Sequence, residues 1–326
     1  MMPAASVGAA WCREYCFASP PLPVVYEATV SHSYAEAIDY LRGRKRELFT
    51  ALHHYGAILL RGFSITTARE FQNAVEVFVP KLANYQGGDS PRLAVTEKIY
   101  TSTSYPAALP IALHNEMSYT REYPSLVAFY CEQPPESDGE TPLADCRRVL
   151  HALPKALVEK LARKRLRYVQ NLAAHAGIGK SWPHTFETSD RARVEAILRA
   201  RGAELEWRAN GALRIVEVVD PIVTHPRTGE RVFFSQAHMW HVSSLDAKTR
   251  RALLKLTSED DLYHHCTFGD GSPISDEDLA EMRRALDAAK IQFAWHKHDL
   301  LLVDNILVAH ARNPFQGERR VLVAMG

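Results

Sequence analysis

The segment DLLLVDNILVAHARNPFQGERRVLVAM, residues 299–325, contains three short apolar runs separated by polar residues. Residues 299–303 and 306–310 are rich in Leu, Ile and Val, and the Asp304-Asn305 pair between them is typical of a turn. Residues 319–325 form the third run. The pattern predicts a strand, a turn, a second strand and then a third.

Further strands are expected upstream, at residues 57–61, 126–131, 215–224 and 231–235. Apolar residues at intervals of three and four predict helices over residues 33–54, 66–82, 146–164, 189–201, 245–257 and 276–290. A doubly wound parallel sheet would require regular alternation of strands and helices, which is not seen. We therefore expect a mainly β fold with flanking helices, built on a double-stranded β-helix (jelly-roll) core.

No internal repeat, low-complexity tract or Gly/Ser linker marks a domain boundary, so residues 1–326 are expected to form one domain. Its N-terminal arm, about residues 1–30, is expected to be irregular. The net charge of +1 gives no support to nucleic-acid binding, and no apolar run reaches the length of a membrane span. The five cysteines include no CxxC pair, which favours a reducing, cytoplasmic location.

The segment LHNEMSY, residues 113–119, contains the first chemically informative pair. If this segment is extended, His114 and Glu116 project from the same side, because side chains alternate along a strand. One imidazole and one carboxylate provide two ligands of a 2-His-1-carboxylate triad, which leaves positions open on a non-haem iron(II) ion. A third ligand would have to come from a distant part of the chain.

His310 ends an otherwise apolar predicted strand, so its ring nitrogens require partners. A hydrogen-bonded core histidine is one reading of this residue, and a metal ligand is the other. The following strand begins at Arg319-Arg320. An arginine there could point into the same barrel and bind a dicarboxylate through its two-pronged guanidinium group.

These stretches together resemble the TauD/TfdA (taurine dioxygenase/clavaminate synthase-like) superfamily of iron(II)- and 2-oxoglutarate-dependent oxygenases. Within it, the chain is most similar to the hydroxylases of syringomycin-type nonribosomal peptide pathways. The matching stretches are GAILLRGF (56–63), LHNEMSY (113–119), GETPLADCR (139–147), HPRTGERVFFSQ (225–236) and residues 299–325. They occur in the family's order and span most of the chain.

The resemblance implies that His114, Glu116 and His310 bind iron and that Thr141 hydrogen-bonds 2-oxoglutarate. It also implies that Arg320 pairs with the distal carboxylate of that cosubstrate. O2 is the remaining cosubstrate that the family uses.

The neighbouring Arg319 is the alternative cosubstrate ligand, but consecutive strand residues face opposite ways, so only one of the two can point inward. We expect Arg320 to be that residue. Contacts with the substrate are expected from residues in or near the matched motifs: Asn84, Tyr105, Asn115 and Tyr119.

The implied reaction is hydroxylation of an unactivated C–H bond of an amino acid or amino-acid-derived substrate in natural-product biosynthesis, with desaturation as the alternative outcome. Because Glu116 is present, halogenation is not expected. Relatives that act on free acids often carry an arginine four residues after the cosubstrate arginine, and Ala324 stands there. We therefore expect a masked substrate carboxylate, for example a thioester on a carrier protein.

Two other classes of protein compete with this reading. A non-catalytic jelly-roll protein could retain a metal for structure, and a zinc hydrolase could use the same two histidines and carboxylate. Neither requires Thr141 and an arginine placed for a dicarboxylate. The remaining histidines, including His53, His238 and His264, are more typical of hydrogen-bonded or helix-terminal positions than of ligands.

Overall fold

The computed structural model describes residues 11–17, 19–83, 88, 92, 95–96, 98–102, 105–175 and 179–326. Its largest sheet has seven strands in the order β1-β2-β3-β16-β6-β19-β4. Their bounds are β1 (Cys12–Cys16), β2 (Val24–Ala28), β3 (Ala57–Arg61), β16 (Leu300–Asp304), β6 (Leu126–Gln133), β19 (Arg320–Met325) and β4 (Tyr100–Thr101). Neighbouring strands are antiparallel except β2 and β3, which are parallel.

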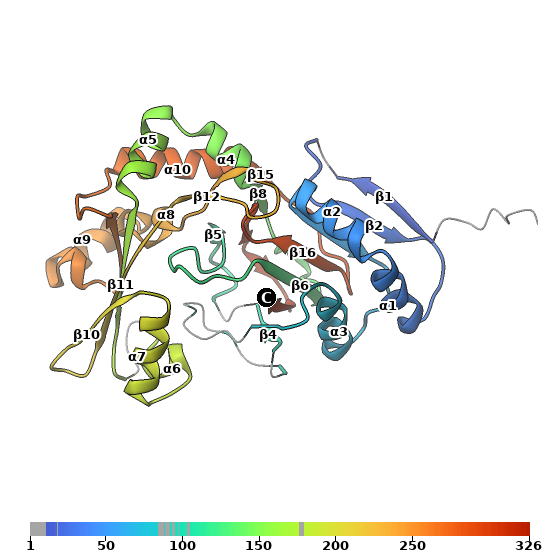
Figure 1. Cartoon of the computed structure of the whole chain (residues 1–326), viewed down its shortest axis with the longest axis horizontal. Coiled ribbons are helices and arrows are strands. Elements are labelled where there is room, and N and C mark those ends of the chain that lie inside the picture. The colour runs from blue at the N-terminus through green and yellow to red at the C-terminus, as the bar shows by residue number, and fades with distance from the viewer. Residues whose placement is uncertain are drawn as a thin grey trace, which may run out of the picture.

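Strand β16 is buried on both faces, which explains its continuous apolar sequence. Leu301 and Val303 belong to the core inside the barrel, whereas Leu300 and Leu302 belong to a second core on the outer face. The outer core lies under three helices, α1 (Tyr34–Gly43), α2 (Lys45–Tyr55) and α3 (Ala68–Phe78). In Figure 1 these helices, drawn in blue, stand beside β16 and β6.

A second sheet completes the barrel with the order β15-β8-β17-β5. Its strands are β15 (Lys290–Ile291), β8 (Leu143–Asp145), β17 (Val308–Arg312) and β5 (Ile111–His114). Two short antiparallel pairs accompany it, β18 (Phe315–Gln316) with β7 (Ser137–Asp138) and β12 (Ile222–Thr224) with β13 (Arg231–Phe233). The expected double-stranded β-helix core is confirmed.

A third sheet, β10-β11-β9-β14, extends from the barrel and was expected only at β11. Its strands are β10 (Glu204–Trp207), β11 (Leu213–Val219), β9 (Leu166–Leu172) and β14 (His264–Phe268). Helices α6 (Trp182–Phe186) and α7 (Arg191–Ala200) pack on it around Phe186 and Leu198. Figure 1 shows β10, β11, α6 and α7 of this unit at the end of the molecule opposite the N-terminal helices.

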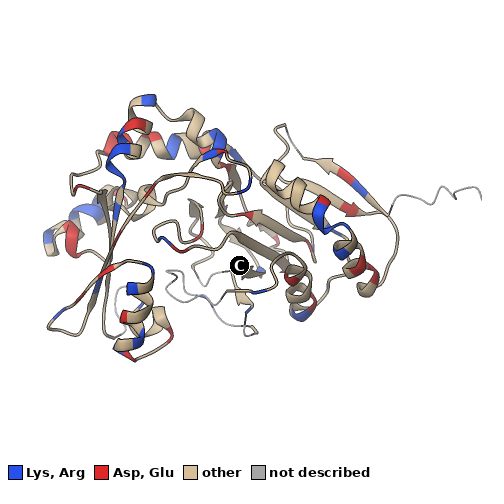
Figure 2. Cartoon of the chain, viewed as in Figure 1, with Lys and Arg blue, Asp and Glu red and all other residues tan. Residues whose placement is uncertain are grey.

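The remaining helices are α4 (Cys146–Ala152), α5 (Lys155–Lys164), α8 (Ala237–Trp240), α9 (Ala247–Leu256) and α10 (Asp276–Ala288), with short 3-10 turns at Val242–Ser244 and Glu259–Asp261. Each predicted helical segment contains at least one of the observed helices. Segment 33–54 divides at Arg44, and segment 146–164 divides before Pro154, which restricts the residue preceding it. Both charge signs are distributed over these peripheral helices (Figure 2).

The expectation of an irregular N-terminal arm is wrong for residues 12–16 and 24–28. These residues form β1 and β2, and β2 joins the main sheet by pairing with β3. Val24 and Val25 are fully buried on opposite faces, so this strand contributes to both cores. Within the described residues, no helix combines the length and the apolar character that crossing a membrane requires.

Candidate metal centre and cosubstrate pocket

The structure brings the three predicted metal ligands together. His310 on β17 is the register partner of His114 at the end of β5, and their ring centroids are 4.5 Å apart. Glu116 follows in the next turn, with its Oε2 4.0 Å from Nε2 of His310. One ligand atom from each residue lies within 4.8 Å of the others. The spacing is that of a site able to close around one cation.

Glu116 reaches this position from a turn, so the expectation of a fully extended segment is wrong beyond His114. Strand β5 ends at His114, and the chain then bends through Met117, whose φ is +56°. The side chain of Asn305 fixes the bend: its Oδ1 accepts a hydrogen bond from the N–H of Glu116 (2.7 Å), and its Nδ2 donates to the carbonyl of Glu116 (3.0 Å).

The protonation states of the histidines suit a divalent cation. Nδ1 of His114 donates to the carbonyl of Ala112 (2.9 Å), so Nε2 is the ring nitrogen suited to bind a metal. Burial lowers the pKa of His310 well below its ordinary value, and the nearby His114 and Arg92 act in the same direction. A neutral imidazole is the form that binds metal, so these residues fit the implied ion.

A pocket adjoins the triad between the two sheets. Its lining includes side chains from both: Arg92, Ser102, Ile111, His114, Phe129, Thr141, His310, Ala311, Arg312 and Arg319. The guanidinium of Arg319 donates from Nε to the carbonyl of Gly139 (2.9 Å), and its Nη2 lies 3.4 Å from Oγ1 of Thr141. Burial, followed by the nearby Arg312, lowers the pKa of Arg319 to about 10, so the group stays cationic at neutral pH.

Thr141 is itself held in place. It is buried, and its hydroxyl accepts a hydrogen bond from Nε1 of Trp295 (3.1 Å). The indole N–H fixes the position of the Thr141 oxygen. The hydroxyl proton of Thr141 can still be donated to another group. Thr141 and Arg319 thus form a preorganised pair of donors in the pocket that His114 and His310 also line.

The choice of Arg320 as the inward-pointing arginine is wrong. Its side chain is 54% exposed and forms an ion pair with Glu132 at 2.7 Å, whereas Arg319 lines the pocket. Register between β19 and β6 shifts between Arg320 and Val321, which marks an irregularity at the start of β19. Such an irregularity changes which residues face inward, so counting from the motif alone selected the wrong neighbour.

The residues expected to contact the substrate are found in different surroundings. Asn84 lies outside the described residues. The Tyr105 side chain is 43% exposed, and its carbonyl accepts a hydrogen bond from Arg312. Asn115 donates to the carbonyl of Asn305 (2.7 Å), and Tyr119 packs on Trp240 within the inner core. Asn115 and Tyr119 thus have partners within the protein, and substrate contact through Tyr105, Asn115 or Tyr119 stays a prediction.

Sequence reasoning missed three residues that hold the metal-binding segment. Asn305 was read only as a turn residue. Gln236 donates to the carbonyl of Asn115 (2.7 Å), and Nε2 of His238 donates to the carbonyl of Leu113 (2.9 Å). Burial lowers the pKa of His238 to about 3, so its ring is neutral. The available signal for Asn305, Gln236 and His238 was a polar residue close to an apolar run, which indicates a buried hydrogen bond.

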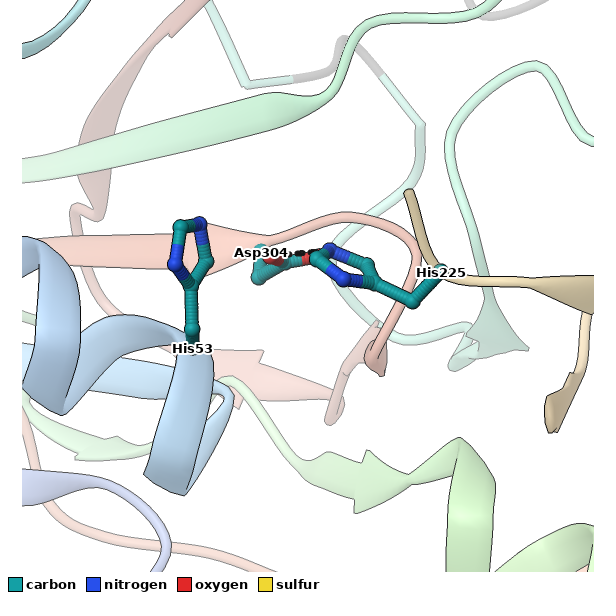
Figure 3. Close-up of side chains that lie close together, drawn as sticks. All are labelled: His53, His225 and Asp304. Carbon is teal, nitrogen blue, oxygen red and sulfur yellow. Dashed lines mark hydrogen bonds and ion pairs between the residues drawn. The ribbon is translucent and has the colours of Figure 1, made fainter. Parts of the chain in front are cut away.

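A second cluster of two histidines and a carboxylate lies outside the pocket: His53 on α2, His225 and Asp304 (Figure 3). Nδ1 of His225 accepts hydrogen bonds from the N–H groups of Arg227 and Thr228, so Nε2 must carry the ring proton. That proton is donated to Oδ2 of Asp304 (3.0 Å). Both ring nitrogens of His225 are thus occupied by hydrogen bonds, and neither has a lone pair left for a metal. We therefore interpret His225 and Asp304 as a hydrogen-bonded pair and not as part of a metal centre.

Comparisons with known proteins identify the family of this chain. The model of the taurine catabolism dioxygenase TauD, TfdA family matches residues 19–325. The dapdiamide synthesis protein DdaC of Enterobacter agglomerans is 35% identical over 274 residues, which cover 84% of this chain and 83% of that protein. The clavaminate synthase-like protein At3g21360 of Arabidopsis thaliana is 30% identical over 300 residues, covering 87% and 86%.

Among solved structures, PvcB of Pseudomonas aeruginosa has a TM-score of 0.54 at 15% identity, covering all of this chain and 94% of its own. At that identity the likeness shows the fold. The chain belongs to the TauD/TfdA family of dioxygenases. It is an oxygenase that depends on iron(II), 2-oxoglutarate and O2, as the sequence motifs indicated.

Proposed function

We propose that this oxygenase hydroxylates an unactivated C–H bond of an amino-acid-type substrate in natural-product biosynthesis. Iron is held by His114, Glu116 and His310, and 2-oxoglutarate is anchored by Arg319 and Thr141. One observation carries the proposal: the cationic Arg319 and the hydroxyl of Thr141 share a pocket with His114 and His310, two of the three potential metal ligands. Neither a structural metal site nor a zinc hydrolase would require that pair.

The protein's own residues position the reactants. Arg319 offers its guanidinium to the distal carboxylate, and Thr141 adds a hydroxyl donor whose direction Trp295 fixes. Phe129 and Ala311 add apolar surface to the lining of the pocket. With 2-oxoglutarate and O2, the bound iron supplies the oxidising chemistry: the cosubstrate becomes succinate and CO2, and one oxygen atom is available to the substrate.

The substrate class rests on two features of the comparisons. DdaC is named for dapdiamide synthesis, and PvcB is described as an Fe, alpha-ketoglutarate dependent oxygenase from an isonitrile synthetic pathway. Both names point to small-molecule biosynthesis. Hydroxylation and desaturation are distinguished by the product, since the first adds one oxygen atom and the second removes two hydrogens.

The masked-carboxylate proposal also needs its key residue corrected. With Arg319 as the inward arginine, the position four residues later is Val323, which belongs to the inner core, whereas Ala324 faces the outer core. Val323 is apolar and cannot bind an anion. A substrate presented on a carrier protein therefore stays our proposal, and efficient turnover of the free amino acid without a carrier would contradict it.

The deciding experiment is the anaerobic addition of iron(II) and then 2-oxoglutarate to the metal-free protein. We expect a weak visible charge-transfer band in the wild type and no band in His310→Ala. Release of succinate in the presence of O2 then tests turnover. Iron binding without the band would contradict cosubstrate chelation and return the structural and hydrolytic alternatives to first place.

A further inference from the structure

One turn connects the metal ligands that come from distant parts of the chain. Asp304 and Asn305 join β16 to the start of β17, the strand that carries His310. Asn305 is fully buried and clamps both backbone polar groups of Glu116, as described above. Its Nδ2 also donates to the carbonyl of Pro124 (2.8 Å), so the amide plane is fixed from both sides.

The carboxylate of Asp304 holds this turn together. Its Oδ1 accepts hydrogen bonds from the N–H groups of Ile306 (3.0 Å) and Leu307 (3.1 Å), just before β17 begins. Its Oδ2 accepts the hydrogen bond from His225. Both side chains are almost fully enclosed, at 5% and 3% exposed, so losing one partner would leave a buried polar group unsatisfied.

His225 reaches this carboxylate from a separate element, the turn between β12 and β13. The two backbone N–H groups that bond its Nδ1 fix both the ring orientation and the tautomer, so Nε2 can act only as a donor to Asp304. Figure 3 shows the His225 ring pointing at Asp304, with His53 approaching from α2. The rings of His53 and His225 are 5.5 Å apart and meet edge to face.

We propose that His225 and Asp304 form a positioning pair for the metal centre. The pair sets the Asp304-Asn305 turn, the turn holds the backbone of Glu116 and the start of β17, and these place the carboxylate opposite the imidazole of His310. Neither His225 nor Asp304 touches the metal, cosubstrate or substrate in this role. The inference rests on the proposed metal assignment.

The test measures metal affinity separately from folding stability. Metal-free wild type, His225→Ala and His225→Gln are titrated anaerobically with Co(II), whose visible absorption reports the geometry of the site. We expect His225→Ala to bind about tenfold more weakly, in line with substitutions that remove the support of metal ligands. His225→Gln, whose amide can donate to Asp304, should recover most of the affinity and the wild-type spectrum.

A second substitution keeps the test informative if His225→Ala does not fold. In Asp304→Asn the side chain keeps its size, and its one oxygen can still accept from the N–H groups of Ile306 and Leu307. Its NH2 group then faces the Nε2–H of His225, so two donors meet and the hydrogen bond is lost. It should weaken Co(II) binding in the same direction as His225→Ala.

The matched control is Asp299→Asn, adjacent to the opposite end of β16. Asp299 forms a buried ion pair with Arg61 at 2.7 Å and belongs to neither His/His/carboxylate cluster. It should lower thermal stability and leave Co(II) affinity unchanged. Wild-type affinity in both His225→Ala and Asp304→Asn would overturn the positioning role, whereas a wild type that binds no metal would overturn the proposed function itself.

Discussion

The guanidinium of Arg92 lies 2.6 Å from Oε2 of Glu116, the same carboxylate oxygen that faces Nε2 of His310. The Arg92 and Glu116 side chains are only 5% and 4% exposed, so this ion pair is enclosed within the site. A cation bound by the triad would use the same carboxylate. Arg92 therefore competes with the metal for Glu116 in the structure described here.

Arg92→Gln is expected to increase metal affinity, because it removes a positive charge that both occupies Glu116 and repels an incoming cation. An increase of about fivefold, equivalent to roughly 1 kcal/mol, is the expected scale. Co(II) titration of the metal-free protein measures it, with Arg92→Lys as the control that retains the charge. A weaker metal complex in Arg92→Gln would mean that the arginine supports the ligated carboxylate instead.

Arg319→Gln and Arg320→Gln form a direct comparison of two adjacent residues. Loss of the Arg319 cation should raise the KM for 2-oxoglutarate by a factor of about one hundred, since a charge-assisted pair in an enclosed pocket contributes on the order of 3 kcal/mol. Arg320→Gln removes only a half-exposed contact with Glu132 and should leave that KM unchanged. Succinate formation at varied 2-oxoglutarate concentration decides between them. The opposite ranking would restore Arg320 as the anchor.

Gly139→Ala is expected to disturb the same anchor through backbone geometry. Gly139 has φ +70°, and an added Cβ would lie 2.8 Å from Phe315 and 3.2 Å from Cδ of Arg319. The substitution should therefore raise the KM for 2-oxoglutarate as well as lower stability. Gly271→Ala is the control, since Gly271 has φ +82° with open space around it. An equal change of KM in both variants would show that backbone strain alone is responsible.

Stability should fall at mildly acidic pH because His238 is buried and neutral. Its folded-state pKa is about 3, below the ordinary 6.5, so its contribution is complete above about pH 6.5 and declines as the pH falls towards 3. Between pH 7.5 and 5.5 this amounts to roughly 1 kcal/mol of the free energy of unfolding. His238→Gln, which preserves a donor for Leu113, should reduce that pH dependence in denaturant titrations. An unchanged pH dependence would contradict the assignment.

The three residues that the structure brings together as potential metal ligands could be singled out from sequence because their signals are local. His114 and Glu116 stand two residues apart, and His310 interrupts an apolar strand. A strand was likewise predicted over residues 306–310, and β17 lies two residues further along, at Val308–Arg312, buried throughout. These features do not depend on knowing which strand pairs with which.

The choice between Arg319 and Arg320 depended on register, which a motif does not encode. A shift in pairing with β6 is a property of two strands together. Strands β1 and β10 were missed for a related reason: charged residues occupy much of each, and the partner strands make them extended. The supporting role of Asn305 was likewise unpredictable, because Glu116 lies 189 positions away in the chain.

The position of strand β16 between two hydrophobic cores has a consequence for how the protein unfolds. Because its alternate side chains anchor two separate hydrophobic cores, the outer helical layer and the barrel share a single wall. Disrupting the packing of either core would expose side chains of the other. We therefore expect the two cores to unfold together in one cooperative transition. The backbone amides of β16 should then be among the slowest in the chain to exchange their hydrogens with heavy water.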